Sequence, residues 1–203
     1  MGSLVILSGP SGSGKTSVAR EVCKIIGLDK TYFSISSTTR NPRDGEQDGV
    51  DYFFLSKDEF LNDIAENQFL EWAEVHGNYY GTSLKPIKEA VSEGKIVFLD
   101  IDVQGFESIQ KLYPEIITSV FVTTENKQIL IDRLKNRGTE TDESLKVRLI
   151  NALSEMRKID EYDYLLINDK FEESVEILEA IAKVSLIKSS KNDLENFIKD
   201  WNK

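Results

Sequence analysis

The stretch "LVILSGPSGSGKTSVAREVCKII" at residues 4–26 decides the fold of this chain. Its first five residues are a short run dominated by apolar side chains, and glycines follow directly. From Val18 onward, apolar residues recur at the spacing of an amphipathic helix. A buried strand, a glycine-rich turn and a helix in this order are typical of the opening of an α/β domain.

The same alternation of apolar run and helical segment recurs three times further along the chain. The runs are "KIVFLDID" (95–102), "ITSVFVT" (117–123) and "YDYLLIN" (162–168), and the helical segments are 103–112, 126–136 and 171–187. Short apolar strands that alternate with helices predict a mainly parallel sheet covered by helices. The fold class is therefore α/β, with a phosphate-binding loop after the first strand.

Two regions depart from this alternation. Residues 32–83 contain "YFSIS", "DYFFL" and "FLEWAEV", which read as short strands of a mixed lobe with one helix near 57–66. Residues 133–157 are rich in charged side chains, and their pattern predicts a helix, a loop around Gly138 and a second helix. Such a helical pair could form a mobile cap over a site. We expect a core of residues 1–32, 84–125 and 158–203, a lobe of residues 33–83 and a lid region of residues 126–157.

The C-terminal tail and the bulk composition set further limits. Leu194, Phe197, Ile198 and Trp201 lie at helical spacing, which predicts a terminal amphipathic helix that packs on the core. The 203 residues carry a formal net charge of −10, which argues against broad nucleic-acid binding. The chain has no apolar run long enough to span a membrane and no secretory signal, so a cytoplasmic location is expected.

The chain has one cysteine and one histidine, which narrows its chemistry. A single cysteine allows no intrachain disulfide, and Cys23 at helical spacing predicts a small buried side chain. A single histidine, His76, argues against a metal site built from several histidines and against a histidine-based catalytic triad.

The segment "GPSGSGKTS" at residues 9–17 carries the strongest chemical signal. It contains Gly9-x4-Gly14-Lys15-Thr16 directly after a strand and before a helix, which is the context that a phosphate-binding loop requires. Glycines let successive backbone amides face a phosphate, and the helix N-terminus adds positive potential. Lys15 would reach the β- and γ-phosphates of a nucleoside triphosphate, and the Thr16 hydroxyl would bind Mg²⁺.

An acidic segment at the end of a predicted strand fits the same site. Asp100 and Asp102 end the run "FLDID", at the carboxyl edge of the sheet where ligands of such folds bind. The combination of a glycine-rich loop, a lysine and an aspartate at a strand end is shared by NTPase motors, GTPase switches and small kinases. No NKxD-type guanine-reading motif is visible, which argues against a GTPase switch.

Residues of the inserted lobe help to distinguish a small kinase from an NTPase motor or a GTPase switch. Arg40 and Arg43 can fork around a phosphate, and two tyrosines, Tyr52 and Tyr80, can donate hydroxyls to it. Glu71 matches guanine, because a carboxylate accepts from both N1–H and the 2-amino group. Ser36 or Thr82 can donate to the guanine O6, whereas adenine would leave the carboxylate facing a lone pair.

Five segments together resemble the guanylate kinase family in order and spacing. They are "SGPSGSGKTS", "SSTTRNPRDGEQDGVDYFFL", "FLEWAEVHGNYYGT", "FLDIDVQG" and "NRGTETDESLKVRL", and the resemblance covers about residues 3–185. It implies a core, a GMP-binding lobe and a lid, with ATP and GMP as small-molecule substrates and Mg²⁺ accompanying ATP.

The resemblance also implies roles for individual residues. ATP would be bound by the loop and by Asn168: Gly9, Pro10, Ser11, Gly12, Ser13, Gly14, Lys15, Thr16, Ser17 and Asn168. GMP would be bound by Ser36, Arg40, Arg43, Tyr52, Glu71, Tyr80, Thr82 and Asp100, with Asp100 preferred over Asp102. Transfer would depend on Lys15, Arg40, Arg133, Arg137 and Arg148, and the metal on Thr16.

Two other interpretations stay open at this point. One is a guanylate-kinase-like interaction module without activity, although such modules usually lack a complete phosphate-binding loop and here Lys15 and Thr16 are present. The other is a nucleoside monophosphate kinase of different specificity, against which Glu71, Ser36 and Thr82 argue. The sequence does not indicate an oligomeric state.

Overall fold

The main sheet of the computed structural model consists of five parallel strands in the order β2-β7-β1-β8-β9. The structure describes all residues except 1, 76, 113–115, 137–141, 189–193 and 202–203. The strands are β1 (Ser3–Ser8), β2 (Thr31–Ser34), β7 (Ile96–Asp100), β8 (Ile117–Thr123) and β9 (Tyr164–Ile167). The predicted parallel sheet is confirmed, and the four apolar runs are four of its strands.

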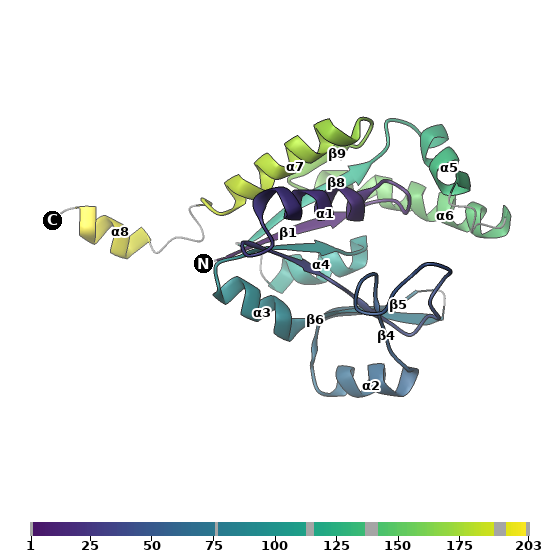
Figure 1. Cartoon of the computed structure of the whole chain (residues 1–203), viewed down its shortest axis with the longest axis horizontal. Helices are drawn as coiled ribbons and strands as arrows, with labels where there is room; N and C mark the ends of the chain where they lie inside the picture. The colour runs from purple at the N-terminus through teal and green to yellow at the C-terminus, as the bar shows by residue number, and fades with distance from the viewer. Residues whose placement is uncertain (1, 76, 113–115, 137–141, 189–193, 202–203) are drawn as a thin grey trace.

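Helices cover both faces of this sheet (Figure 1). Helices α1 (Lys15–Ile26) and α7 (Phe171–Ser185) lie on one face, and α3 (Leu84–Ser92) and α4 (Val103–Leu112) lie on the other. In β1, Val5 and Leu7 pack toward α1 and α7, whereas Leu4 and Ile6 pack toward α3 and α4. Both faces of β1, β7 and β8 are buried, which explains why these strands read as continuous apolar runs. The edge strand β9 differs, because Tyr164, Leu165 and Ile167 are exposed.

The placement of "YFSIS" in the inserted lobe was wrong. Residues 31–34 form β2, which pairs in parallel with β7 at the edge of the main sheet. Tyr32 and Phe33 are partly buried against the two opposite core clusters, so the segment is sandwiched like its neighbours. An edge strand has one neighbour and less complete burial, and the resulting alternation resembles that of a half-exposed lobe strand.

A smaller mixed sheet in the order β4-β3-β6-β5 builds the inserted lobe. Its strands are β3 (Ser37–Thr38), β4 (Phe53–Phe54), β5 (Phe69–Val75) and β6 (Asn78–Ser83), and it is accompanied by α2 (Lys57–Ala65). A capping box between Ser56 and Glu59 fixes the start of α2. Phe60 of this helix is fully buried and stacks on Phe69 with ring centroids 4.4 Å apart.

Helices α5 (Lys127–Asn136) and α6 (Asp142–Glu155) form the helical pair that was expected around Gly138. Leu130, Leu134 and Ala152 form a small core between them. The connection 137–141, which contains Gly138, lies outside the described residues. A 3-10 helix, η1 (Met156–Glu161), returns the chain from α6 to the main sheet.

The C-terminal helix α8 (Leu194–Trp201) has the predicted secondary structure, but it stands apart from the rest of the molecule (Figure 1). Ile198 is 56% exposed and Trp201 is 78% exposed. The prediction that these two side chains pack on the core was therefore wrong. Within the described ranges, no helix is both long and apolar enough to cross a bilayer.

Candidate active site

The loop after β1 can adopt its path only because it is rich in glycine. Gly9, Gly12 and Gly14 have φ angles of 128°, 93° and 93°, in the left-handed region that other residues avoid. A Cβ on Gly9 would lie 2.2 Å from the carbonyl oxygen of Val122 in β8. The loop therefore lies close against the sheet and leads directly into α1, whose first residue is Lys15.

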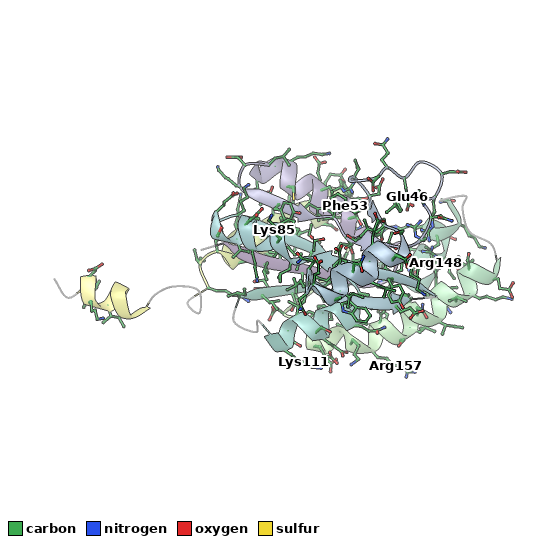
Figure 2. All side chains as sticks on the ribbon, turned by 90° about the horizontal axis from the view of Figure 1, so that it is seen from below. Glu46, Phe53, Lys85, Lys111, Arg148 and Arg157 are labelled. Carbon is green, nitrogen blue, oxygen red and sulfur yellow. The ribbon has the colours of Figure 1, made fainter. Side chains whose placement is uncertain are left out.

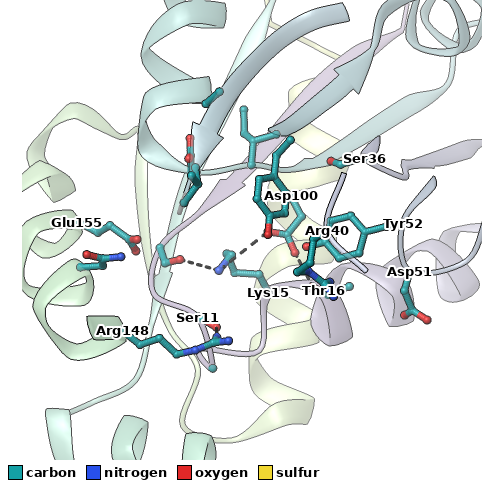
Figure 3. A pocket seen from close by; sticks show the side chains of 18 of the residues that line it. Ser11, Lys15, Thr16, Ser36, Arg40, Asp51, Tyr52, Asp100, Arg148 and Glu155 are labelled. Atoms are coloured by element: carbon teal, nitrogen blue, oxygen red, sulfur yellow. Dashed lines mark hydrogen bonds and ion pairs between the residues drawn. The ribbon is translucent and has the colours of Figure 1, made fainter. Parts of the chain in front are cut away.

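Lys15 and Thr16 converge on Asp100 at the carboxyl edge of the sheet (Figure 3). The Lys15 Nζ donates to the carbonyl oxygens of Gly9 at 2.6 Å and Pro10 at 3.2 Å, and it lies 4.0 Å from Asp100 Oδ1. The Thr16 hydroxyl donates to Asp100 Oδ2 at 2.5 Å. An ammonium, a hydroxyl and a carboxylate thus meet beside the glycine loop.

The two aspartates at the end of β7 make different contacts: Asp100 is the last residue of the strand, and Asp102 lies two residues beyond it. Asp100 contacts the loop residues, as described above, whereas Asp102 Oδ1 accepts from the backbone N–H of Gly105 at 2.8 Å and fixes the first turn of α4. Both carboxylates line the same cavity. The pairing with Thr16 and Lys15 shows that Asp100 is the aspartate that contacts the start of α1.

A cavity of about 880 Å³ lies between the loop, the lobe and α6. It is large enough to hold drug-sized ligands. Figure 2 shows Glu46 of the lobe and Arg148 of α6 at the same end of the molecule, opposite α8. The predicted site residues that line the cavity are Gly9, Ser11, Gly12, Gly14, Lys15, Thr16, Ser17, Ser36, Arg40, Arg43, Tyr52, Glu71, Tyr80, Asp100 and Arg148.

One end of the lobe is basic and aromatic. The guanidinium of Arg40 lies 5.3 Å from the ring centroid of Tyr52 and is paired with Glu46 at 2.8 Å. Tyr52 and Tyr80 meet edge to face, with ring centroids 6.1 Å apart. Burial raises the pKa of Tyr52 to about 12, and the negative charge of Asp100 acts in the same direction. Tyr52 therefore keeps its proton near neutral pH and can donate it in a hydrogen bond.

The other end of the lobe holds a carboxyl group in an unusual environment. Burial raises the pKa of Glu71 to about 7, the hydrogen bond from the Thr82 hydroxyl at 2.5 Å works against this rise, and the charge of Asp102 adds to it. A Cβ on Gly105 of α4 would lie 2.9 Å from Glu71 Oε2. Gly105 thus leaves the room that brings this carboxyl group against α4. Thr82 is buried beneath Glu71 and contacts it without lining the cavity itself.

The arginines of the helical pair occupy different places. Arg148 of α6 lines the cavity and donates to the Ser11 hydroxyl at 2.5 Å. Arg133 of α5 lies behind the loop and donates to the carbonyl oxygens of Ser13 at 3.3 Å and Asn168 at 2.8 Å. Arg137 lies outside the described residues.

Asn168 is buried behind the loop. Its amide Nδ2 donates to the Ser13 carbonyl at 2.7 Å, and a Cβ on Gly14 would lie 2.3 Å from the same nitrogen. Arg133 and Asn168 are not among the residues that line the cavity. In this structure both side chains support the main chain of the phosphate loop from the side of β9. Pro10 and Ser13 likewise contribute through their backbone carbonyls, which bind Lys15 and Asn168.

Several lining residues carry chemistry that the sequence did not single out. Glu46 binds Arg40 through both carboxylate oxygens, and Glu155 at the end of α6 faces the cavity with burial raising its pKa. Arg20 of α1 also lines the cavity and pairs with Asp51 at 3.7 Å. Acidic residues in a polar loop or at a helix end are common, and no periodicity marks them. The sequence offered one indication of the pairing: Glu46 follows the two lobe arginines closely, three residues after Arg43 and six after Arg40.

Comparison with known proteins identifies the family. A model of the family "Guanylate kinase" matches residues 1–184. The guanylate kinase of Wolinella succinogenes is 47% identical over 200 residues, which span 98% of this chain and 92% of that protein. The guanylate kinase of Helicobacter pylori is 48% identical over 198 residues, which span 98% of this chain and 95% of that protein.

A solved structure gives the same result in three dimensions. The crystal structure of guanylate kinase from Anaplasma phagocytophilum superposes with a TM-score of 0.78 at 28% sequence identity. The match covers 98% of this chain and 94% of that one, so it includes the main sheet, the lobe and the helical pair. With a complete glycine loop, a two-ended cavity and relatives of this similarity, the chain belongs to the guanylate kinase family.

Proposed function

We propose that this chain transfers the γ-phosphoryl group of ATP to GMP, giving ADP and GDP, as a nucleoside monophosphate kinase of the cytoplasm. One observation carries the proposal: a single cavity is lined by the phosphate-loop residue Lys15 and by a lobe that offers two arginines at one end and Glu71 at the other. Such a cavity has room for a triphosphate donor and a purine monophosphate acceptor. We assign the donor to the core, the acceptor to the lobe and the closing element to α5 and α6.

The donor would be held by the glycine loop and by Lys15. The backbone amides of the loop and the N-terminus of α1 favour phosphate oxygens. Lys15 would exchange its contacts with the Gly9 and Pro10 carbonyls for the β- and γ-phosphates. We assign Arg133 and Asn168 to holding this loop in place, since both bind the Ser13 carbonyl. Arg148, already 2.5 Å from Ser11, lies where it would meet the transferred group.

The residues present fit a magnesium ion that arrives with ATP. Among the described residues there is no group of three or more His, Cys, Asp or Glu side chains that could hold a metal ion by themselves. Magnesium typically takes one or two protein oxygens and completes its shell with water and substrate phosphates. Thr16 and Asp100, whose oxygens lie 2.5 Å apart, would supply that share. When bound, the ion neutralises charge on the β- and γ-phosphates.

The acceptor phosphate would lie at the basic end of the lobe. Arg40 and Arg43 supply charge-assisted donors, and the hydroxyls of Tyr52 and Tyr80 add neutral ones. Its attacking oxygen is already ionised near neutral pH, so the transfer requires no general base. The protein's task is to bring two anionic groups together in line and to exclude water. Arg148 would add positive charge as α6 moves over the cavity.

The base would be read at the other end of the lobe. An ionised Glu71 would accept from guanine N1–H and the 2-amino group, and Ser36, which lines the cavity, would donate to O6. Thr82 donates to Glu71 in this structure, which fixes the orientation of the carboxylate. Adenine has an N1 lone pair and a 6-amino donor at the same edge, so it would leave a buried acceptor unpaired.

A coupled assay tests the proposal directly. ADP formation is measured with ATP and magnesium and, in turn, with GMP, AMP, UMP or CMP as acceptor. We expect turnover with GMP and at least a hundredfold lower kcat/KM with AMP. Turnover with none of the four acceptors would instead support a module that binds without catalysis. Equal turnover with AMP would refute the assignment of Glu71 to guanine.

The pKa of Glu71 predicts that GMP binding releases a proton. Guanine donors stabilise the ionised carboxylate, so the bound state favours the form that is only half populated at pH 7. Affinity should therefore level off above about pH 8 and fall as pH drops, by about tenfold between pH 8 and pH 6. Isothermal titration calorimetry in buffers of different ionisation enthalpy measures both the affinity and the proton released.

Guanosine is the matched ligand for this measurement. The phosphate of GMP itself titrates near pH 6, by analogy with other phosphate monoesters. Guanosine carries the same base without that group, so its binding reports Glu71 alone. A guanosine affinity that stays flat from pH 8 to pH 6 would contradict the placement of the carboxylate against the base.

A further inference from the structure

Arg40 is held from within the lobe by three hydrogen bonds to Glu46 and Asn41, and the side chain of Tyr80 also hydrogen-bonds to it. Its Nη1 donates to Glu46 Oε2 at 2.8 Å and to the Asn41 carbonyl at 2.7 Å, and its Nη2 donates to Glu46 Oε1 at 3.0 Å. The two contacts with Glu46 form a bidentate pair of the kind that fixes the plane of a guanidinium. A guanidinium has five N–H donors, so the bonds to Glu46 and Asn41 occupy three of them. The other two, Nε–H and the second Nη2–H, form the adjacent edge, which is itself a fork suited to a phosphate.

The pair is shielded and its orientation is further restricted. The exposed fractions of the two side chains are 14% for Arg40 and 19% for Glu46. The guanidinium lies over the rings of Tyr52 and Phe54, with 5.3 Å and 5.7 Å to their centroids. Such a pair is screened less by solvent than the exposed ion pairs of the surface, and its geometry is correspondingly better defined.

Glu46 also connects the two arginines of the lobe. Its Oε2 accepts from the backbone N–H of Arg43 at 2.8 Å, in addition to the contact with Arg40. Burial acts to raise the pKa of Glu46, but the bonds from Arg40 and Arg43 hold it below its usual range. Glu46 is thus ionised near neutral pH and is the common acceptor of the loop that carries both proposed phosphate-binding residues.

The carboxylate of Glu46 reduces the positive charge that Arg40 and Arg43 present to the phosphate. Two arginines alone would present a charge of +2 to the phosphate, and Glu46 reduces this to +1. A site selected only for attraction to a dianion would not contain it. The bidentate geometry offers another reason: Glu46 takes one edge of Arg40 and thereby presents the other edge in a fixed direction, so that less freedom is lost when phosphate binds.

We propose that Glu46 is a positioning residue for the acceptor site, which holds one edge of the Arg40 guanidinium and aims the other at the phosphate of GMP. This inference rests on the proposed function and adds to it a specificity element that does not touch the base. Glu46 acts through Arg40, so its influence is confined to ligands that carry a 5′-phosphate. ATP binding and base recognition do not depend on it.

The experiment compares Glu46→Ala and Glu46→Gln with the wild-type chain. For Glu46→Ala we expect KM for GMP to rise about thirtyfold, as for loss of one partner of a shielded charge pair, with kcat and KM for ATP changed less than threefold. Glu46→Gln keeps one acceptor for Arg40 and should raise KM by only about fivefold. Asp44→Asn, an exposed change in the same loop, is the charge control and should leave all constants unchanged.

Two further measurements separate positioning from a role in folding. Guanosine, assayed as an inhibitor competitive with GMP, should bind Glu46→Ala as well as wild type, because it lacks the phosphate. In an Arg40→Ala background, Glu46→Ala should add less than twofold to KM, because the residue acts through that arginine. Thermal unfolding shows whether each variant is folded.

Three results would overturn the proposal. Tighter binding of GMP by Glu46→Ala would show that the carboxylate competes with the phosphate for Arg40. Equal weakening of guanosine and GMP would mean that Glu46 supports the lobe as a whole. Full additivity with Arg40→Ala would show that it acts independently of that residue. Failure of the proposed function is distinguished from these, since the wild-type chain would then transfer no phosphoryl group to GMP.

Discussion

Replacing Lys15 by methionine is expected to lower phosphoryl transfer from ATP to GMP by about a thousandfold while GMP affinity changes less than threefold. In the proposed function the Lys15 ammonium is the positive group that follows the γ-phosphate, and no other lysine lines the cavity among the described residues. Methionine has a similar length and keeps the loop packed, but it cannot compensate the charge that develops during transfer. The readouts are kcat in the coupled assay and GMP affinity by calorimetry.

Lys24→Met is the matched control for this variant. Lys24 belongs to the same helix α1, its side chain is 67% exposed, and it pairs with Glu21 one turn away at 2.8 Å. An exposed pair of this kind contributes well under 1 kcal/mol, so turnover and stability should both stay near wild type. Normal turnover of Lys15→Met would remove the glycine loop from the mechanism and with it the assignment of the donor site.

Replacing Glu71 by glutamine is expected to lower kcat/KM for GMP about a hundredfold and to reduce the GMP/AMP preference by at least as much. A glutamine can accept only one of the two guanine donors and turns its own NH₂ toward the other, which leaves donors facing each other. The same amide suits adenine, because its NH₂ can donate to N1. The measurement is kcat/KM for both acceptors at saturating ATP, above pH 7, where wild-type Glu71 is ionised.

A neighbouring residue of the same strand provides the control for Glu71→Gln. Residues 71, 73 and 75 of β5 line the cavity, whereas Glu74 points to the other face and is exposed. Glu74→Gln should therefore leave the acceptor preference unchanged. An unchanged GMP/AMP ratio in Glu71→Gln would disprove the reading of guanine by this carboxylate.

Stability distinguishes lost recognition from lost folding in Glu71→Gln. The pKa of Glu71 in the folded chain, about 7, lies above the ordinary value of 4.5, so the folded state binds more protons between these values. The wild-type chain should lose up to about 3 kcal/mol of stability as pH rises through this window. Glu71→Gln should not show this loss and should be no less stable than wild type above pH 7, as measured by denaturant unfolding at several pH values.

The core of the fold was predictable because it obeys simple periodicity. The strands at 95–102 and 117–123 are buried on both faces and appear as apolar runs, so they needed no tertiary information. The strand at 162–168 was found from its apolar residues alone, although three of the four residues of β9 are exposed. β2 was misplaced because an edge strand shows the mixed pattern of an exposed one. Helix α3 was not anticipated, since its apolar face extends over only nine residues and includes a proline. The packing of α8 depends on whether a partner face is available, which amphipathic spacing does not reveal.

The candidate site was predictable in its residue types and less so in its contacts. The loop pattern at Gly9 to Thr16 is local, so its geometry follows from the sequence alone. Lobe residues such as Arg40 and Glu71 lie far apart in the chain, and only the fold brings them to one cavity. The sequence could not show that Arg133 and Asn168 face the back of the loop, because that depends on how α5 and β9 meet it. Glu46 was missed because its pairing with Arg40 is a property of loop conformation.

The central position of β1 has a consequence for how the chain is made. All six of its residues are buried, and its partners β7 and β8 begin only at Ile96 and Ile117. A ribosome that adds about 5 to 20 residues per second therefore needs on the order of 5 to 20 s to supply the first of these partners. During that time the nascent polypeptide carries an apolar segment that has high strand propensity and cannot yet pair. The central strand of the sheet is thus synthesised well before both of its partners, and this apolar segment needs protection from aggregation until they appear.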